Sequence, residues 1–387
     1  MTIKVSILKS VLHENDLFNL RNNKFLQSIE EELNNKLIIS DLNDYNCDLK
    51  LIFIESGGSE MLFLNQLENL KAPFYFLTSG DNNSLAATLE ILTYLNVHGI
   101  KGEIIHGDIK QITKRINELL YKNNKTLLYG KTYGVIGTPS DWLIASIPDS
   151  DEVYDKFGCH IEYIDLRVLL NEYAKINIDN SNLSGFDENE LKKAVKVNQA
   201  LENICLKYKL DGFTLRCFDL LDTIKTTGCL GLARLNEKGF IGTCEGDIMA
   251  MLSMAIAKAI SGKSCFQANP SRIDIQTNRV VFAHCTIPLD MVNSYKFMTH
   301  FESGIGVAVK GELREDTVTI FRLSSDLKTY FVSRGKIISN LNYDNLCRTQ
   351  IEVELEENVN QLLTNPCGNH HIIFYGDYVD EIKELLR

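Results

Sequence analysis

The stretch GTCEGDIMAMLSMAIAKAISG, residues 242–262, stands where the character of the chain changes. The run from Ile248 to Ile260 is apolar on every face and rich in Ala, Met and Leu, which predicts a buried helix. Gly262 can end this helix, and Asp247 can cap its first turn. The stretch therefore predicts a buried helix with Glu245 just before its N-terminus.

The residues before this stretch alternate between short apolar strands and helical patterns. From residue 3 to about 125 the strands read IKVSIL, LKLIFIE, FYFLTS and GEIIHG, and a second unit runs from KTYGVIG through CHIEYID to GFTLRC. This alternation predicts parallel sheets with flanking helices. After about residue 265 the chain turns to strands such as NRVVFAHCTI, KTYFVSRGKII and HHIIFYGDY. We expect antiparallel structure there, as a small barrel or a sandwich.

The composition limits the possible partners. The 387 residues suffice for two or three domains, and 44% hydrophobic with 24% charged residues is typical of a globular protein. A net charge of -11 without a basic run disfavours nucleic acid and anionic membranes. With no apolar run of membrane-spanning length and no signal-peptide pattern, we expect a cytoplasmic protein. None of the ten cysteines forms Cys-x-x-Cys, so we expect structural thiols.

Glu245 is the first candidate metal ligand. It precedes a predicted helix N-terminus, where the partial positive charge favours an ionised carboxylate. The alternative is that Glu245 and Asp247 both merely cap the helix.

Imidazoles recur downstream, with His284 in FAHCTIP, His300 in THFESGIG, and the adjacent His370 and His371 in GNHH. Side chains alternate along a strand, so only one of the last two can enter a given site. Each lone histidine can instead be a satisfied core residue. Carboxylate and imidazole without thiolate pairs suit Mn²⁺ or Mg²⁺.

Four motifs in order, CEGD, FQANPSRID, AHCTIP and GNHHIIFYGDY, resemble the C-terminal half of the L-fucose isomerase and L-arabinose isomerase superfamily. The phrase YGVIGTPSDWLIAS in the second unit is similar to it too. The resemblance implies an α/β protein with two Rossmann-like domains, which we place at 1–125 and 126–264, and a C-terminal antiparallel β-barrel-like domain at 265–387. It also implies a homo-oligomer, either a trimer or a hexamer.

The activity implied by the resemblance is that of an aldose–ketose isomerase, an intramolecular oxidoreductase that works through an ene-diol on a pentose or deoxyhexose. The implied cofactor is Mn²⁺ (or Mg²⁺), held by Glu245, Asn269 and His370. Fucose isomerases have an Asp where this chain has Asn269, and an amide can coordinate a metal but cannot act as a base. We therefore take Glu245, Asp247 and Asn269 as the catalytic set. The expected contacts to the sugar are Trp142, Arg216, Arg272, His284, His300 and His371.

Other functions stay open. A non-catalytic sugar-binding or regulatory relative would fit the loss of the second acid at Asn269. A metal hydrolase using His284 and His370 is a weaker alternative. The identity of the sugar depends on pocket shape, which no motif encodes.

Overall fold

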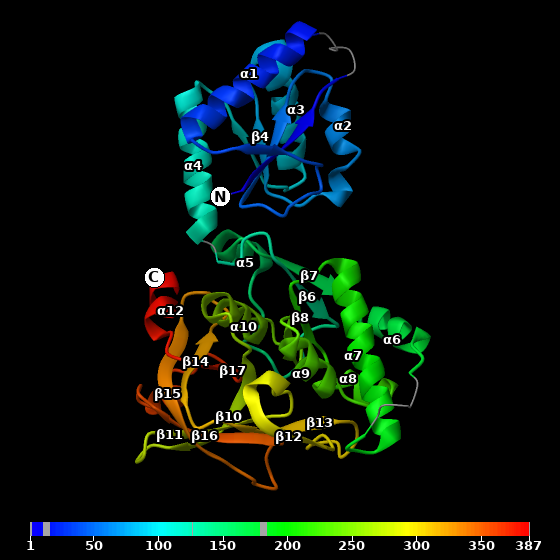
Figure 1. The fold of residues 1–387 in the computed structure, drawn as a ribbon, viewed down its shortest axis with the longest axis vertical. Coiled ribbons are helices and arrows are strands. Elements are labelled where there is room, and N and C mark those ends of the chain that lie inside the picture. The colour runs from blue at the N-terminus through cyan, green and yellow to red at the C-terminus, as the bar shows by residue number, and fades with distance from the viewer. Residues whose placement is uncertain (1, 11–15, 126, 179–183, 387) are drawn as a thin grey trace. The chain divides into compact units, whose positions relative to one another are not determined.

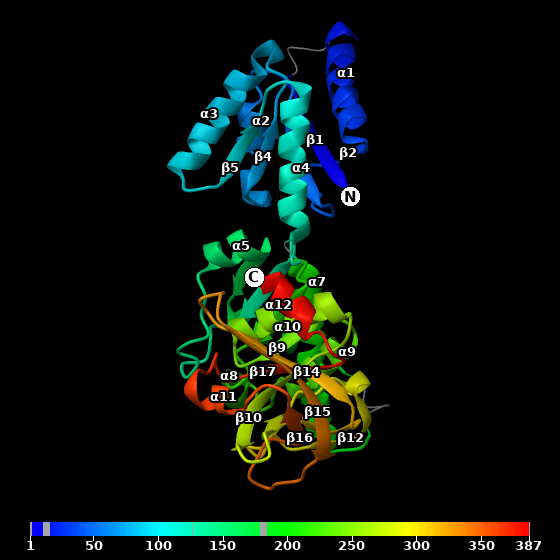
Figure 2. The ribbon, with the colours of Figure 1, turned by 90° about the vertical axis from the view of Figure 1, so that its left-hand side faces the viewer.

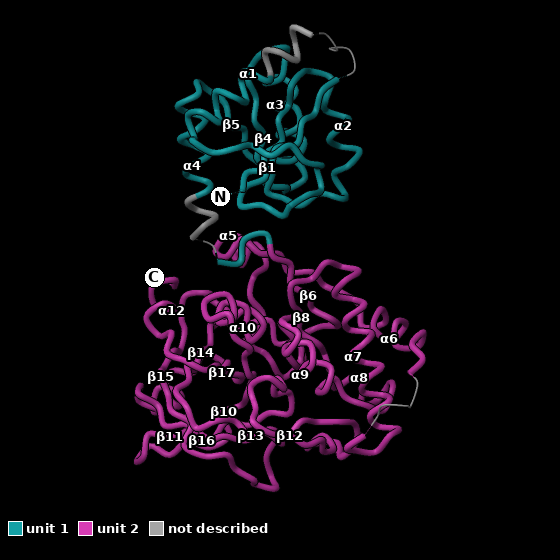
Figure 3. Tube along the Cα trace, viewed as in Figure 1, with its two compact units in different colours: residues 1–130 teal, residues 131–387 magenta. Residues whose placement is uncertain are grey.

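This computed structural model describes residues 2–10, 16–125, 127–178 and 184–386. The chain divides into two compact units, Met1–Gly130 and Lys131–Arg387 (Figure 3). None of the helices in the described segments combines the length and the apolar character needed to cross a membrane.

The first unit is a five-stranded parallel sheet with strand order β2-β1-β3-β4-β5. Its strands are β1 (Ile3–Leu8), β2 (Leu37–Ile39), β3 (Leu49–Ile54), β4 (Phe74–Leu77) and β5 (Gly102–Ile105). Its helices are α1 (Asp16–Leu33), α2 (Glu60–Leu64), α3 (Ser84–Val97) and α4 (Ile109–Lys125). Each face has its own apolar core, with α1 and α4 on one face and α2 and α3 on the other (Figure 2). The four predicted strands are confirmed, and the short β2 was missed.

The second unit begins with a four-stranded parallel sheet of order β7-β6-β8-β9. Its strands are β6 (Thr132–Ile136), β7 (His160–Ile164), β8 (Gly212–Leu215) and β9 (Ile241–Cys244). The accompanying helices are α5 (Ser150–Phe157), α6 (Leu166–Lys175), α7 (Glu188–Tyr208), α8 (Asp219–Thr223) and α9 (Cys229–Glu237). The second α/β region predicted from the sequence is therefore confirmed.

The last third forms a closed antiparallel barrel of order β10-β11-β16-β15-β14-β17. Its strands are β10 (Phe266–Asp274), β11 (Arg279–His284), β14 (Thr317–Leu323), β15 (Tyr330–Asn340), β16 (Thr349–Leu355) and β17 (His371–Tyr375). The chain also forms the hairpin sheet β12 (Val292–Met298) with β13 (Ala308–Leu313), and the helices α11 (Asn360–Thr364) and α12 (Val379–Leu386). Of the two forms expected for this region, the structure has the barrel.

Helix α10 (Ile248–Ser261) joins the parallel sheet to the barrel. It packs against β8 and β9 on one side and against β14 and β17 on the other (Figure 1). Residues 248–257 are all buried, as expected of a helix that is apolar on every face. Asp247 caps the helix by accepting from the backbone N–H of Ala250, and Gly262 ends it with φ 68. These features confirm the prediction for the opening stretch.

The domain limits at residues 125 and 264 stay predictions. The first lies near the division between the two compact units, after Gly130. The second falls inside the second unit, between α10 and β10. Because α10 packs against both layers, the parallel sheet and the barrel share part of their core.

Candidate active site

A tight turn at the carboxyl end of β9 presents Glu245. Glu245 has φ 68 and Gly246 has φ 71, so two successive residues adopt left-handed backbone conformations. A side chain at Gly246 would place Cβ 2.6 Å from the carbonyl oxygen of Thr138. The backbone oxygen of Glu245 accepts from the N–H of Ser140. A non-glycine residue in this region is strained by about 1–2 kcal/mol, and such strain is common at functional sites.

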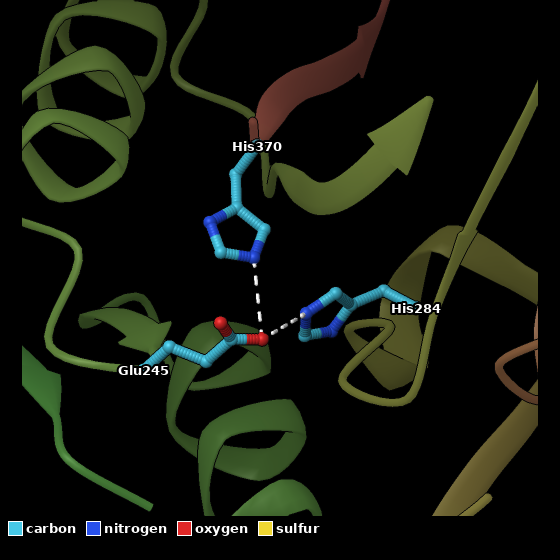
Figure 4. Close-up of side chains that lie close together, drawn as sticks. All are labelled: Glu245, His284 and His370. Carbon is cyan, nitrogen blue, oxygen red and sulfur yellow. Dashed lines mark ion pairs between the residues drawn. The ribbon is translucent and has the colours of Figure 1, made fainter. Parts of the chain in front are cut away.

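Two imidazoles face one oxygen of this carboxylate (Figure 4). Oε1 of Glu245 lies 3.4 Å from Nε2 of His370 and 3.9 Å from Nε2 of His284. One ligand atom from each residue lies within 4.8 Å of the others. The other oxygen, Oε2, accepts a 2.7 Å hydrogen bond from the indole N–H of Trp142. Glu245 precedes α10, His284 ends β11 and His370 immediately precedes β17. Together these three residues, the triad, have the composition of a divalent-metal site.

Asp247 contacts the His370 ring on the side away from Glu245. Its Oδ2 lies 2.8 Å from Nδ1 of His370 and accepts a 3.0 Å bond from Nη1 of Arg322, while Oδ1 accepts from the N–H of Ala250. Because a carboxylate only accepts, Nδ1 of His370 carries a proton and Nε2 points toward Glu245. Asp247 is fully buried and has three donors, so it orients the site and has no oxygen open to a substrate.

The charges of the site follow from these contacts. Burial raises the pKa of Glu245, but the contacts with His284 and His370 outweigh burial and hold that pKa well below its usual range. Burial also raises the pKa of Asp247, yet the Arg322 charge and His370 hold it at about 2. At His370 burial lowers the pKa, but the bonds to the two carboxylates raise it to about 9. Burial lowers the pKa of His284. At pH 7 the two carboxylates are therefore ionised and are balanced by Arg322 and by protonated His370, whose proton a cation would displace.

His284, which the sequence predicts as a sugar contact, lies beside Glu245 and His370. Nδ1 lies 3.0 Å from the hydroxyl of Thr286, and Nε2 faces Glu245. This orientation suits a metal ligand, because the hydrogen bond on one ring nitrogen directs the other toward the ion.

Asn269 lies on β10, between β17 and β11 in the barrel. It pairs with the residue before His284, and the residue before Asn269 pairs with His371. Gln267, two residues earlier, accepts from the backbone N–H of Cys244. By alternation Asn269 points to the same side, toward the turn that carries the carboxylates. Its Oδ1 is buried and has no hydrogen-bond partner among the described residues, and the same holds for Nε2 of His370. A buried amide oxygen without a partner, beside a ring nitrogen that becomes an acceptor once His370 gives up its proton, fits a site for a cation.

A row of ring side chains, Trp142, Phe218 and His300, begins next to the Glu245 carboxylate. The ring of Trp142, which is half-exposed, packs edge-on against Phe218 at 5.0 Å, and Phe218 packs edge-on against His300 at 5.7 Å. Nδ1 of His300 lies 3.1 Å from the Ser303 hydroxyl. Burial lowers the pKa of His300 to about 4, so its ring is neutral at pH 7. Such a row of rings beside a carboxylate can contact the apolar face of a sugar.

Two predicted sugar contacts are arginines that bind other groups of the protein. Arg216 pairs with Asp141 and Asp219, and it braces the loop that carries Trp142. Arg272 stacks over Tyr343 at 3.9 Å, with no contact to the triad in the described part of the chain.

His371 packs inside the barrel against Phe282 and Phe331. Burial lowers its pKa to about 3. The adjacent histidines do point to opposite sides, as the strand pattern predicts, and His370 is the one at the site. This placement gives no support to a sugar contact by His371.

Arg322 was missed by the sequence reasoning. It belongs to TVTIFRL on β14, where Val318 and Ile320 point into the barrel core. An arginine two residues further along the same face is a charge at a core position. A charged residue at a position that the strand pattern assigns to the core was the signal that could have identified Arg322.

No protein-family model matches the chain. It is 23% identical to the proteins named sulfoquinovose isomerase from Priestia aryabhattai and Priestia megaterium, in alignments of 411 positions that cover all of this chain and 85% of each relative. A protein of the same name from Alkalicoccus urumqiensis is 22% identical over 278 positions, which cover 66% of this chain and 62% of that protein. The full-length similarity to named isomerases supports the prediction that this chain is an isomerase.

Proposed function

We propose that this protein is a divalent-metal-dependent aldose–ketose isomerase that acts through an ene-diol. The observation that carries the proposal is the convergence of Nε2 of His284 and Nε2 of His370 on one oxygen of Glu245. The similarity to named isomerases over the full chain supports the same class of reaction.

The residues present fit Mn²⁺ or Mg²⁺ as the cofactor. Glu245, His284 and His370 would hold the ion, and Asn269 would add a neutral oxygen ligand. When bound, such an ion polarises the carbonyl of a sugar and the neighbouring hydroxyl. Trp142 keeps the Glu245 carboxylate oriented through Oε2.

The proton must move between neighbouring carbons, and two groups near Glu245 are suited to carry it. His300 is neutral at pH 7 because burial lowers its pKa to about 4, so it has a lone pair that can accept a proton. Glu302 is exposed, and partial desolvation together with the charge of Glu245 raises its pKa, which favours a carboxyl that both gives and takes a proton. We assign the proton transfer to His300 and Glu302. We do not assign it to Asp247, because its oxygens are buried and already bind Ala250, Arg322 and His370.

The substrate class that we propose is a pentose or a deoxyhexose. The name of the relatives makes sulfoquinovose the first sugar to test, beside L-fucose and L-arabinose. We further propose, following the resemblance, that the two parallel sheets are Rossmann-like and that the protein is a cytoplasmic trimer or hexamer. Light scattering of the purified protein measures the oligomeric state.

A non-catalytic sugar-binding relative is the second candidate, because Asn269 stands where the second acid is expected. Such a protein would bind sugar and leave it unchanged.

The two candidates separate in one experiment. Metal-stripped and Mn²⁺-loaded protein are incubated with the sugar panel, and the products are resolved by chromatography. Our proposal expects interconversion of one aldose–ketose pair by the loaded protein only, with loss of turnover in Glu245→Gln. Sugar binding without any conversion across the panel would favour the second candidate.

A further inference from the structure

A buried arginine stands behind the candidate metal site. Arg322 and Asp247 both have fully buried side chains and pair at 3.0 Å. Burying an ion pair costs desolvation free energy that the attraction between the charges often fails to recover, so the pair is a poor device for stability alone. Its position beside the candidate site points to a role in holding the geometry of that site.

The guanidinium connects three segments that build the site. Nη1 donates to Asp247 at the mouth of α10, and Nη2 donates at 2.8 Å to the hydroxyl of Ser146, on the loop that also carries Trp142. Nε donates at 3.4 Å to the carbonyl of Cys367, three residues before His370. A lysine offers one ammonium group and cannot reproduce this planar set of donors.

The chain leaves space for this group. Gly368 has φ 126, and a Cβ there would lie 2.8 Å from Nη2 of Arg322. The backbone that leads to His370 therefore runs directly over the guanidinium. A side chain at this position would displace either the arginine or the histidine-bearing segment.

We propose that Arg322 is a positioning residue for the candidate metal site. It holds Asp247 in place, Asp247 holds Nδ1 of His370, and Nε2 of His370 is thereby directed at Glu245. The role in turnover rests on the proposed isomerase function. The geometric role of Arg322 can be measured without turnover.

The first test needs no metal. In metal-stripped protein labelled with ¹⁵N-histidine, the Nδ1–H of His370 should give a slowly exchanging resonance, identified by its loss in His370→Gln. We expect Arg322→Met and Asp247→Asn to lose or shift that resonance. Arg334→Met should leave it unchanged, because the ion pairs of Arg334 with described residues are surface pairs with Glu356 and Asp377.

The second test is calorimetric titration with Mn²⁺. Mutations of groups that orient a metal ligand weaken metal binding by about 10- to 100-fold, and we expect that loss in Arg322→Met with a smaller loss in Arg322→Lys. Arg334→Met should bind Mn²⁺ as the wild type does. If Arg322→Met does not fold, Arg322→Lys and Ser146→Ala carry both tests, with smaller effects in the same direction.

The outcomes separate the two claims. A folded Arg322→Met, or in its place Arg322→Lys, with an unchanged His370 resonance and unchanged Mn²⁺ affinity would overturn the role of Arg322. Wild-type protein that binds Mn²⁺ but converts no sugar would refute the isomerase function, while the resonance and the affinities would still decide the role of Arg322. Wild-type protein that binds no divalent ion would overturn both.

Discussion

The affinity of the candidate site for Mn²⁺ should rise steeply with pH. His370 must release a proton before Nε2 can hold a cation, and its pKa is raised to about 9, against the effect of burial, by Asp247 and Glu245. Below that pH the apparent affinity should increase about tenfold per pH unit, which is about 100-fold, or about 2.7 kcal/mol, from pH 6.5 to 8.5. The other two ligands add little slope, since the pKa of Glu245 lies far below this range and that of His284 is lowered from 6.5.

Calorimetric titration of metal-stripped protein measures this slope directly. Repeating the titration in two buffers of different ionisation enthalpy also counts the protons released, and we expect about one near pH 7. His371→Gln is the matched control, because the His371 ring packs inside the barrel. It should keep the slope, whereas His370→Gln should weaken binding and flatten the slope. A pH-independent affinity in the wild type, or equal losses in the two variants, would refute the assignment of His370 as a ligand.

Four further substitutions test the surroundings of the site. Asn269→Asp adds a negative charge beside the ion and should raise the Mn²⁺ affinity about tenfold, and an unchanged affinity would place Asn269 outside the site. Trp142→Phe removes a hydrogen bond to a charged group and should lower kcat/KM about tenfold, with an unchanged Tm. His300→Gln should lower turnover by about 100-fold or more while Mn²⁺ affinity stays within about twofold; equal losses of both would make His300 a ligand instead. The pKa of His371 is about 3 in the folded state and about 6.5 when unfolded, so the unfolded chain takes up the proton first on acidification. The wild type should therefore lose about 2 kcal/mol of unfolding free energy from pH 7 to 5 through this group, and denaturant titrations of His371→Leu should show that loss removed.

Local sequence patterns predicted most of the fold because each pattern has a local physical cause. The buried helix α10 followed from an apolar run with Asp247 before it and Gly262 after it. The strand pattern alone left a barrel and a sandwich open, and the barrel was predicted from the family resemblance, because closure depends on the pairing of β10 with β17, which are far apart in the chain.

The candidate site was predicted only in part. Glu245 could be singled out by its position before the helix, the family resemblance selected His370 over His371, and the structure brings Glu245 and His370 together. The orientation of His284 depends on Thr286 and on the end of β11, and so it was not visible in the motif AHCTIP. Arg322 was missed because its partners Asp247 and Ser146 lie 75 and 176 residues away along the chain.

Deuterium incorporation into a sugar tests the central claim most directly. Wild-type protein loaded with Mn²⁺ is incubated in D₂O with sulfoquinovose, L-fucose, L-arabinose and further aldoses and ketoses, and exchange at C2 of the aldose or C1 of the ketose is followed by NMR. An isomerase that works through an ene-diol should exchange this proton in one aldose–ketose pair, and stripping the metal or introducing Glu245→Gln should abolish the exchange. Exchange that persists in Glu245→Gln, or sugar binding by the loaded wild type without exchange in any member of the panel, would contradict the account.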